Sequence, residues 1–349
     1  MKMKIGIVGF GFMGHCLANM FNSFDDIRLV AVADINPEQL KDAPEGVERY
    51  SSIEDMLEKA DIDVVMISTP NPSHLEMVEK CAKAKKHIIC EKPAALTVAE
   101  FDQMVKVAKE NNVIFTVHQQ RRWDKDYRIM KEVYDKEMLG DVYLIKSQLY
   151  GFNGYMHDWH IYPEMGGGML YDWGVHLIDQ ILNMVDSKID SIYADLRNVI
   201  NEKVDDYFKI LMKFKNGVTA EIELGTYYLT PKRAWFIGGN TGSAIIDGFD
   251  GEGRIVRTTH LLENVPGKIT MTAAGPTRSF GPPPPGLLYE EELPKVSVSH
   301  RDYFEHFLKA FRGEEEIMVK PEEVRRVLAV MEAIRESART GEAIRFEHE

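Results

Sequence analysis

Five short apolar runs are spaced along the first third of the chain, and each is nearly continuous in hydrophobic character. They lie at residues 5–8, 29–33, 64–67, 87–90 and 113–117. Apolar side chains on both faces indicate strands that are covered on both sides, as in a parallel sheet. The intervening stretches have helical periodicity, with one apolar stripe along residues 97–111. This alternation predicts an α/β domain with a doubly wound parallel sheet, which we place at residues 1–120.

The pattern changes after residue 120. Strands expected at 207–214 and 218–224 alternate between apolar and polar residues, and Lys215-Asn216-Gly217 between them suits a tight hairpin. These features predict an α+β domain at residues 121–349, whose mostly antiparallel sheet has one face covered by helices. Its other elements are expected to be strands at 142–149 and 192–200, helices at 126–136, 169–184 and 321–340, and an extended proline-rich loop at 275–286 outside any sheet.

The charge balance restricts the partners of the chain. Its 42 Lys and Arg residues stand against 55 Asp and Glu residues, which gives a formal net charge of −13. Such a surface repels phosphate backbones and anionic membranes, so we expect neither nucleic acid nor a membrane as partner. The three cysteines, Cys16, Cys81 and Cys90, form no CxxC spacing and are expected to be buried thiols in a reducing compartment. A soluble, cytoplasmic protein is therefore predicted.

A glycine motif follows the first expected strand. Gly9, Gly11 and Gly14 form GxGxxG where a helix should begin, and Asp34 stands 20 residues after Gly14, at the tip of the second strand. Such a loop lets a pyrophosphate approach the helix N-terminus, and the acid accepts hydrogen bonds from the ribose hydroxyls. The motif predicts bound NAD. The alternative is a glycine turn without a ligand, with Asp34 as a helix cap.

Polar residues follow the other strands of the first domain. The segments are Ser68-Thr69-Pro70-Asn71, Glu91-Lys92-Pro93 and His118-Gln119-Gln120. Because ligands of open α/β sheets bind at the carboxyl ends of the strands, we expect these segments to meet in one crevice. Lys92 is the candidate donor to a substrate oxygen; the alternative is a surface lysine paired with Glu91.

A second cluster lies in the other domain. Gly166, Gly167 and Gly168 precede Asp172 and His176, whose spacing of four residues places both on one face of a helix. The carboxylate can orient the ring or the substrate, while the imidazole accepts a proton. The alternative is a surface Asp–His pair without a ligand.

Two histidines, His157 and His160, are three residues apart, but no third ligand stands at a recognisable spacing. We therefore predict no metal site. The aromatic residues Trp123, Tyr155, Trp159 and Tyr162 are interpreted either as flat surfaces against a ring substrate or as core residues.

The glycine loop, Glu91-Lys92-Pro93, Arg121-Arg122-Trp123-Asp124, residues 166–176 and residues 336–341 together resemble the glucose–fructose oxidoreductase / inositol dehydrogenase / rhizopine catabolism (Gfo/Idh/MocA) family. The resemblance implies a Rossmann domain that binds NAD(P), a C-terminal domain with a large open sheet, and oxidation of a secondary hydroxyl on a sugar, cyclitol or related polyol. It places the catalytic residues at Lys92, Asp172 and His176. Two departures are Gln120, where the family often has Asn, and Trp159-His160, where it often has Trp-Arg.

These observations give a complete expected site. The expected cofactor-binding residues are Gly9, Gly11, Phe12, Met13, Gly14, Asp34, Thr69, Asn71, His74, Glu91, Lys92 and Gln120. The expected substrate-binding residues are Arg122, Trp123, Tyr155, Trp159, His160, Asp172 and His176.

The expected function is an NAD-dependent dehydrogenase that oxidises a ring hydroxyl of a sugar, cyclitol or glycoside, with hydride transfer to nicotinamide C4. One alternative keeps NAD tightly bound and uses transient oxidation to cleave or epimerise a glycoside, and another is a non-catalytic NAD-binding regulator. A homo-oligomer is expected through the uncovered face of the second sheet, with Trp235-Phe236-Ile237 as a candidate apolar segment.

Overall fold

The computed structural model describes residues 2–151, 155–259, 269–278 and 285–347. Its first part is a six-stranded sheet in the order β3-β2-β1-β4-β5-β6, and every neighbouring pair is parallel. The strands are β1 (Met3–Val8), β2 (Ile27–Ala33), β3 (Glu48–Tyr50), β4 (Val64–Ile67), β5 (His87–Cys90) and β6 (Phe115–Val117). The predicted doubly wound fold is confirmed. Only the short strand β3 was missed, because an edge strand of three polar residues has no apolar run.

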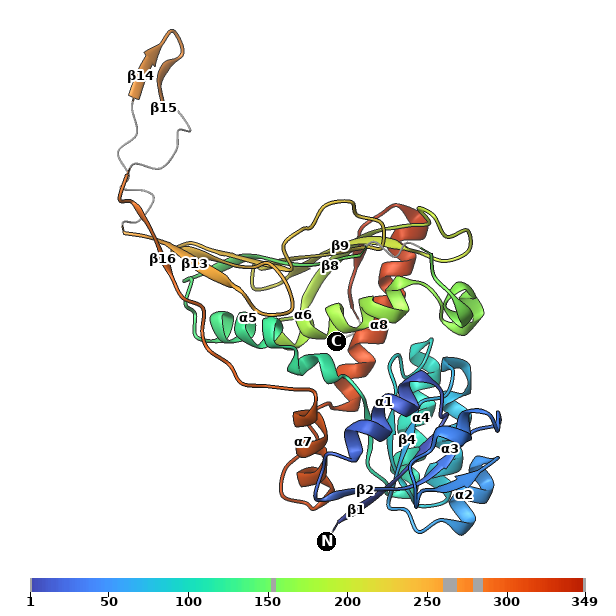
Figure 1. The fold of residues 1–349 in the computed structure, drawn as a ribbon. Coiled ribbons are helices and arrows are strands. Elements are labelled where there is room, and N and C mark those ends of the chain that lie inside the picture. Colours follow the sequence, from blue (N-terminus) through green and yellow to red (C-terminus); the bar gives the residue numbers. More distant parts are fainter. Residues whose placement is uncertain (1, 152–154, 260–268, 279–284, 348–349) are drawn as a thin grey trace.

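Helices accompany this sheet, as the alternation predicts (Figure 1). They are α1 (Phe12–Phe21), α2 (Ile53–Lys59), α3 (His74–Lys83) and α4 (Val98–Asn111). Helix α4 begins where expected, because the hydroxyl of Thr97 accepts a hydrogen bond from the N–H of Glu100. Val64 to Ile67 are buried along the whole of β4, which shows that both faces of the sheet are covered.

The second part is a nine-stranded sheet in the order β16-β13-β12-β11-β7-β10-β9-β8-β17. Only the β7–β10 pair is parallel, so the predicted large, mostly antiparallel sheet is confirmed. Helices α5 (Lys125–Asp135), α6 (Val175–Met184) and α8 (Pro321–Thr340) cover one face (Figure 1). The strands are β7 (Val142–Tyr150), β8 (Ile189–Arg197), β9 (Tyr207–Phe214), β10 (Thr219–Gly225), β11 (Trp235–Gly239), β12 (Gly242–Ile246), β13 (Gly253–Thr258), β16 (Leu288–Glu291) and β17 (Ile344–Arg345).

Two expectations for the second sheet need correction. Strand β8 begins three residues before the predicted start at 192 and ends at Arg197. Residues 275–278 are not loop, because β15 (Gly275–Arg278) pairs with β14 (Ile269–Thr272) in a separate antiparallel hairpin. Pro276 lies inside that strand, which is compatible with its position in a two-stranded ribbon that has only edges. Residues 282–284 of the proline run lie outside the described residues.

The proposed outward apolar segment also needs correction. Trp235 and Ile237 point towards the helices and are buried, and the indole N–H of Trp235 donates to Asp126 of α5 at 2.9 Å. Of the three residues, only Phe236 alternates to the other face and is half-buried. Among the cysteines, Cys81 and Cys90 are buried as predicted, but Cys16 is exposed because it lies on the outer side of α1.

The chain returns to the first sheet near its end. Helix α7 (Arg301–Phe311) packs there, with the ring of Phe304 4.9 Å from that of Phe21 and the Tyr303 hydroxyl donating to the carbonyl of Val117 at 3.0 Å. The two sheets are thus linked by the segment after β6 and again by α7 and α8. No helix in the described ranges is long and apolar enough to span a bilayer.

Candidate active site

The glycine loop lies between β1 and α1, and its three glycines have different environments. A Cβ atom on Gly9, whose φ is +83°, would lie 2.6 Å from the backbone of Ser68, and one on Gly14 would lie 2.6 Å from the carbonyl oxygen of Gly9. A Cβ on Gly11 would meet nothing within 4 Å. No side chain caps the helix, which begins at Phe12, so its first N–H groups stay available. This open surface at a helix N-terminus fits a pyrophosphate.

Asp34 follows β2 beside this loop. Its Oδ2 accepts a hydrogen bond from the N–H of Phe10 at 2.6 Å, and its Oδ1 accepts one from the N–H of Asn36 at 2.7 Å. The backbone therefore holds the carboxylate next to the glycines, where the remaining lone pairs can accept ribose hydroxyls. The side chains of Phe12 and Met13 extend from the start of α1; Phe12 is 82% exposed and Met13 is half-buried.

His74 is buried inside the first domain. Its ring is fully buried, with Nδ1 3.1 Å from the carbonyl oxygen of Ala94 and 3.2 Å from that of Pro93, and Nε2 2.8 Å from that of Thr69. Burial lowers the pKa of His74. These contacts favour a role in holding the segment after Lys92, in place of the direct cofactor contact that we expected.

A buried Glu–His contact supports the end of β5. The Oε1 atom of Glu91 lies 2.7 Å from Nδ1 of His118, and its Oε2 accepts the N–H of Lys92 at 3.2 Å. Burial alone would raise the pKa of Glu91, but His118 and Lys92 more than offset this, and the pKa is lowered. Glu91 therefore fixes the backbone from which the Lys92 side chain extends.

Lys92 and Asp172 meet across the two parts of the molecule. Nζ of Lys92 donates to Oδ1 of Asp172 at 2.9 Å and to the Asp172 carbonyl oxygen at 2.8 Å. Both side chains are about one-fifth exposed, at 18% and 21%. The amine of Lys92 is thus paired with Asp172 and not with Glu91, so the alternative of a surface Lys–Glu pair is wrong.

The glycine run before Asp172 makes room for protein atoms. A Cβ on Gly168, whose φ is +97°, would lie 2.3 Å from Oδ1 of Asp205. The other oxygen of Asp205 accepts the N–H of Leu170 at 2.7 Å, and burial raises the pKa of Asp205 to about 6. At the start of the run, Nδ2 of Asn71 donates to the carbonyl of Met165 at 3.0 Å. The run is therefore held between Asp205 and Asn71.

The helix expected at 169–184 has two parts. Residues Leu170–Gly174 form a π-helical turn, and the α-helix α6 begins only at Val175. From these two parts, Asp172 reaches the segment after β5, and His176 reaches the segment after β6. These two strands are neighbours in the first sheet, so the two side chains are still brought to adjacent strand ends.

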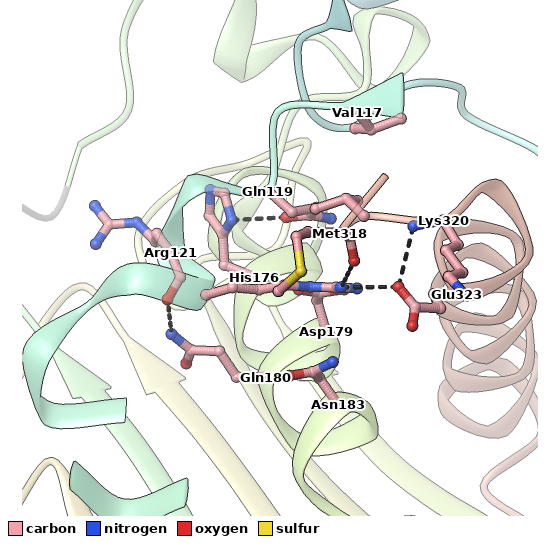
Figure 2. Close-up of polar contacts among 12 residues, drawn as sticks. Val117, Gln119, Arg121, His176, Asp179, Gln180, Asn183, Met318, Lys320 and Glu323 are labelled. Carbon is pink, nitrogen blue, oxygen red and sulfur yellow. Dashed lines mark hydrogen bonds and ion pairs between the residues drawn. The ribbon is translucent and has the colours of Figure 1, made fainter. Parts of the chain in front are cut away.

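His176 is 2% exposed, and its Nδ1 lies 3.0 Å from Oε1 of Gln119 (Figure 2). Burial lowers its pKa well below the usual value, and four neighbouring side chains act in the same direction: Lys92, Arg121, His118 and His300. The imidazole is therefore neutral at pH 7, as a proton acceptor must be.

A cleft of about 580 Å³ opens beside Asp172. Its wall includes aromatic residues that sequence reasoning did not assign to the site, and Trp173 and Phe249 face each other there with ring centroids 6.0 Å apart. Tyr155, 67% exposed, and His160 also line it, and the ring of His160 stacks on Trp159 at 3.8 Å. In the described ranges no three His, Cys, Asp or Glu side chains gather as metal ligands.

Arg122 and Trp123 lie away from this cleft. Arg122 is buried and donates to both oxygens of Asp179, at 2.8 and 2.7 Å, and to Glu323 at 2.8 Å. Trp123 is buried against Tyr303, with ring centroids 5.6 Å apart. Our expectation that both contact substrate needs correction, because internal partners already occupy them.

Arg121 and Gln119 also lie at the site but were not among the expected site residues. Arg121 has its guanidinium 3.9 Å from the centre of the Trp173 ring and donates to Asp124 at 2.9 Å, while its carbonyl accepts from Gln180 at 2.8 Å (Figure 2). Gln119 contacts His176. Both belong to the run of polar residues after β6, which was the available signal. Gln120, in contrast, has its Oε1 buried without a partner among the described residues.

The first part is a Rossmann sheet with an open glycine loop. The second part brings an aspartate and a histidine to the strand ends of that first sheet. This arrangement defines a two-domain dinucleotide-binding protein. Residues 3–119 match the oxidoreductase family with an NAD-binding Rossmann fold, and residues 127–245 match the GFO/IDH/MocA C-terminal domain. The chain belongs to this family, and its first domain is an NAD-binding domain.

Several relatives extend this comparison. An NAD-binding protein from Listeria innocua has a crystal structure that is 35% identical over 99% of both chains, with a TM-score of 0.91. Myo-inositol 2-dehydrogenase of Thermotoga maritima is 28% identical over 229 residues, which are 63% of this chain and 68% of that protein. Scyllo-inositol 2-dehydrogenase (NADP(+)) of Bacillus subtilis is 25% identical over 99% of this chain and 96% of its own.

Proposed function

We propose that the protein is an NAD-dependent dehydrogenase that oxidises a secondary ring hydroxyl of a sugar, cyclitol or glycoside. The observation that carries the proposal is the meeting of the Lys92–Asp172 pair and neutral His176 at the ends of adjacent strands β5 and β6. The aromatic cleft beside Asp172 and the two inositol dehydrogenases among the relatives support the substrate class.

The cofactor would be held by the glycine loop and Asp34. The open surface at Gly11 and the free N-terminus of α1 would take the pyrophosphate, and Asp34 would accept the ribose hydroxyls. The carboxylate opposes the charge of about −1.5 to −2 on a 2′-phosphate, which favours NAD over NADP. When bound, the nicotinamide ring accepts the hydride at C4.

Side chains of the protein would remove the proton of the substrate hydroxyl. Lys92 donates a hydrogen bond to the substrate oxygen and thereby stabilises the negative charge that develops there. Nε2 of His176 accepts the proton of the substrate hydroxyl as the hydride leaves the carbon that carries this hydroxyl. Asp172, held by Lys92, orients the substrate or the ring. A rival assignment makes Lys92 the base and leaves His176 to bind substrate.

The test is a panel of inositols, aldoses and glycosides, each mixed with the enzyme and NAD, with NADH followed by absorbance. NADH formed in step with product supports the proposal. Product without free NADH would favour the enzyme that keeps its cofactor and uses transient oxidation. NAD binding without turnover on any member of the panel would favour the regulator.

We also propose the division into domains at residue 120, a cytoplasmic location and a homo-oligomer. The free thiols of all three cysteines suit a reducing compartment. The outer face of the second sheet exposes Tyr143 and Tyr193, which suits a contact with a second copy. Sedimentation at micromolar concentration tests the oligomer, and a particle of 39.9 kDa would contradict it.

A further inference from the structure

Gln119 stands between the two parts of the molecule. It follows strand β6 of the first sheet, its side chain is 0% exposed, and its Oε1 lies 3.0 Å from Nδ1 of His176 on α6 (Figure 2). The residue belongs to neither the cofactor-binding nor the catalytic set derived above. Its contact is nevertheless made to the proposed base.

This contact determines where the imidazole carries its hydrogen. A carboxamide oxygen only accepts hydrogen bonds, so a bond to Oε1 requires a hydrogen on Nδ1. In a neutral ring the lone pair is then on Nε2. Within the described part of the chain, no group is hydrogen-bonded to Nε2 of His176, which leaves that atom for a ligand.

Burial and the surrounding groups make the ring neutral but do not choose its tautomer. The groups that face it are Lys92 after β5, His118 and Arg121 after β6, and His300 before α7, and all of them disfavour the imidazolium. A neutral ring with the hydrogen on Nε2 would be equally compatible with them. The choice between the two tautomers therefore falls to Gln119.

We propose that Gln119 is a positioning residue that holds His176 as the Nδ1–H tautomer and so leaves Nε2 able to accept the hydroxyl proton. The inference rests on the proposed function, because the tautomer matters for catalysis only if His176 is the base. It also means that a strand end of the nucleotide-binding domain prepares a catalytic group carried by the other domain.

The amide orientation supplies the counter-hypothesis. Nε2 of Gln119 is buried and has no partner among the described residues. Rotating the amide would turn this group towards Nδ1 of His176 and would require the hydrogen on the other ring nitrogen. The two orientations predict opposite tautomers, which can be measured directly.

The experiment is long-range ¹H–¹⁵N NMR of the full chain with ¹⁵N-labelled histidine and added NAD, with His176 assigned by its loss in His176→Asn. Wild type should show a protonated Nδ1. Gln119→Met should lose this preference and lower kcat by about 10–100-fold, as removal of outer hydrogen-bond partners typically does. Gln119→Glu keeps an acceptor and adds a charge, so it should retain Nδ1–H and move the acid limb of kcat/KM up by about one to three pH units.

Thr116→Val is the matched control. The Thr116 hydroxyl on β6 is also buried and also bonds across to the C-terminal part, at 2.8 Å from the carbonyl of Val319. Its loss should lower Tm but leave the tautomer and the pH profile unchanged. A wild-type ring protonated at Nε2, or a pH profile that Gln119→Glu does not move, would overturn the inference. The predicted tautomer without NADH from any polyol would instead contradict the proposed function.

Discussion

The two parts of the molecule hold their functional groups in different ways. The six-stranded sheet presents Lys92 and Gln119 two residues after the ends of buried strands β5 and β6, whose parallel ladder fixes the start of each segment. The second part presents Asp172 from a π-helical turn that follows three glycines and is held by side chains. Regular strands position the first set, whereas the second set depends on side-chain contacts, from Asp205 within its own part and from Lys92 and Gln119 across the interface. Substitutions at the interface should therefore affect the second set more than the first.

The largest expected effect is that of Lys92→Ala. The substitution removes both the donor to the substrate oxygen and the tie to Asp172, so it should lower kcat by at least the ~10²–10⁴-fold typical of a positioned catalytic group. Steady-state NADH formation measures the effect. Lys86→Ala, just before the same strand, is the control and should leave kcat unchanged. A Lys92→Ala enzyme within threefold of wild type would exclude the proposed role.

His176→Asn separates the two assignments of the base. If His176 accepts the proton, kcat should fall by about 10²–10⁴-fold while NAD still binds. If Lys92 is the base, the substitution should mainly raise KM. Calorimetry with NAD and saturating-substrate kinetics measure both quantities. Wild-type kcat at saturation would show that the histidine is not the base.

Arg122→Ala tests the corrected position of this arginine. The substitution leaves Asp179 buried without its partner, and breaking such a pair typically costs about 3–5 kcal/mol. Denaturant unfolding measures this loss. Arg325→Ala removes an exposed bidentate pair with Asp102 and should cost less than about 1 kcal/mol. Equal losses in the two variants would contradict the interpretation of Arg122 as a buried residue held by internal partners.

Asp34→Ala tests the cofactor preference of the first sheet. A hydrogen bond to a charged group is worth about 1.5–3 kcal/mol, so NAD should bind roughly 10–100-fold more weakly. The discrimination against NADP should narrow, because the opposing charge is gone. Comparison of kcat/KM for the two cofactors gives the result. Equal wild-type values for NAD and NADP would refute the assigned preference.

The smallest effect is an expected lack of change with pH. Because the pKa of His176 is lowered well below the usual value of about 6.5, its ring stays neutral down to that pH. Initial rates of NADH formation should therefore be flat from pH 7.5 to 6.5 and should fall only at lower pH, when Nε2 becomes protonated. A rate that already halves between pH 7.5 and 6.5 would contradict a neutral buried base.

The structural elements that could be predicted from the sequence are those determined by residues close together in the chain. Continuous apolar runs identify the buried strands, and the helices expected at 97–111 and 321–340 are found at Val98–Asn111 and Pro321–Thr340. Irregular features escaped it. The π turn after Met169 begins at Leu170, whose N–H is hydrogen-bonded to Asp205, 35 residues away in the sequence.

The roles of individual side chains were harder to predict for the same reason. Arg122 and Trp123 are residue types typical of a sugar site. Only their partners Asp179 and Tyr303, which are distant in the sequence, show that the two side chains are buried within the protein. Gln119 and Gln120 are identical in type, and tertiary contacts alone distinguish them.

The return of α7 to the first sheet has a consequence for how the protein is made. The ring of Phe304 packs against Phe21, and the Tyr303 hydroxyl donates to the carbonyl of Val117, so residues 301–311 of the C-terminal part complete the packing of the first sheet. During translation, N-terminal domains usually fold as soon as they emerge from the ribosome. Here the nucleotide-binding half cannot complete its core until residues 301–311 have been synthesised, after most of the other half.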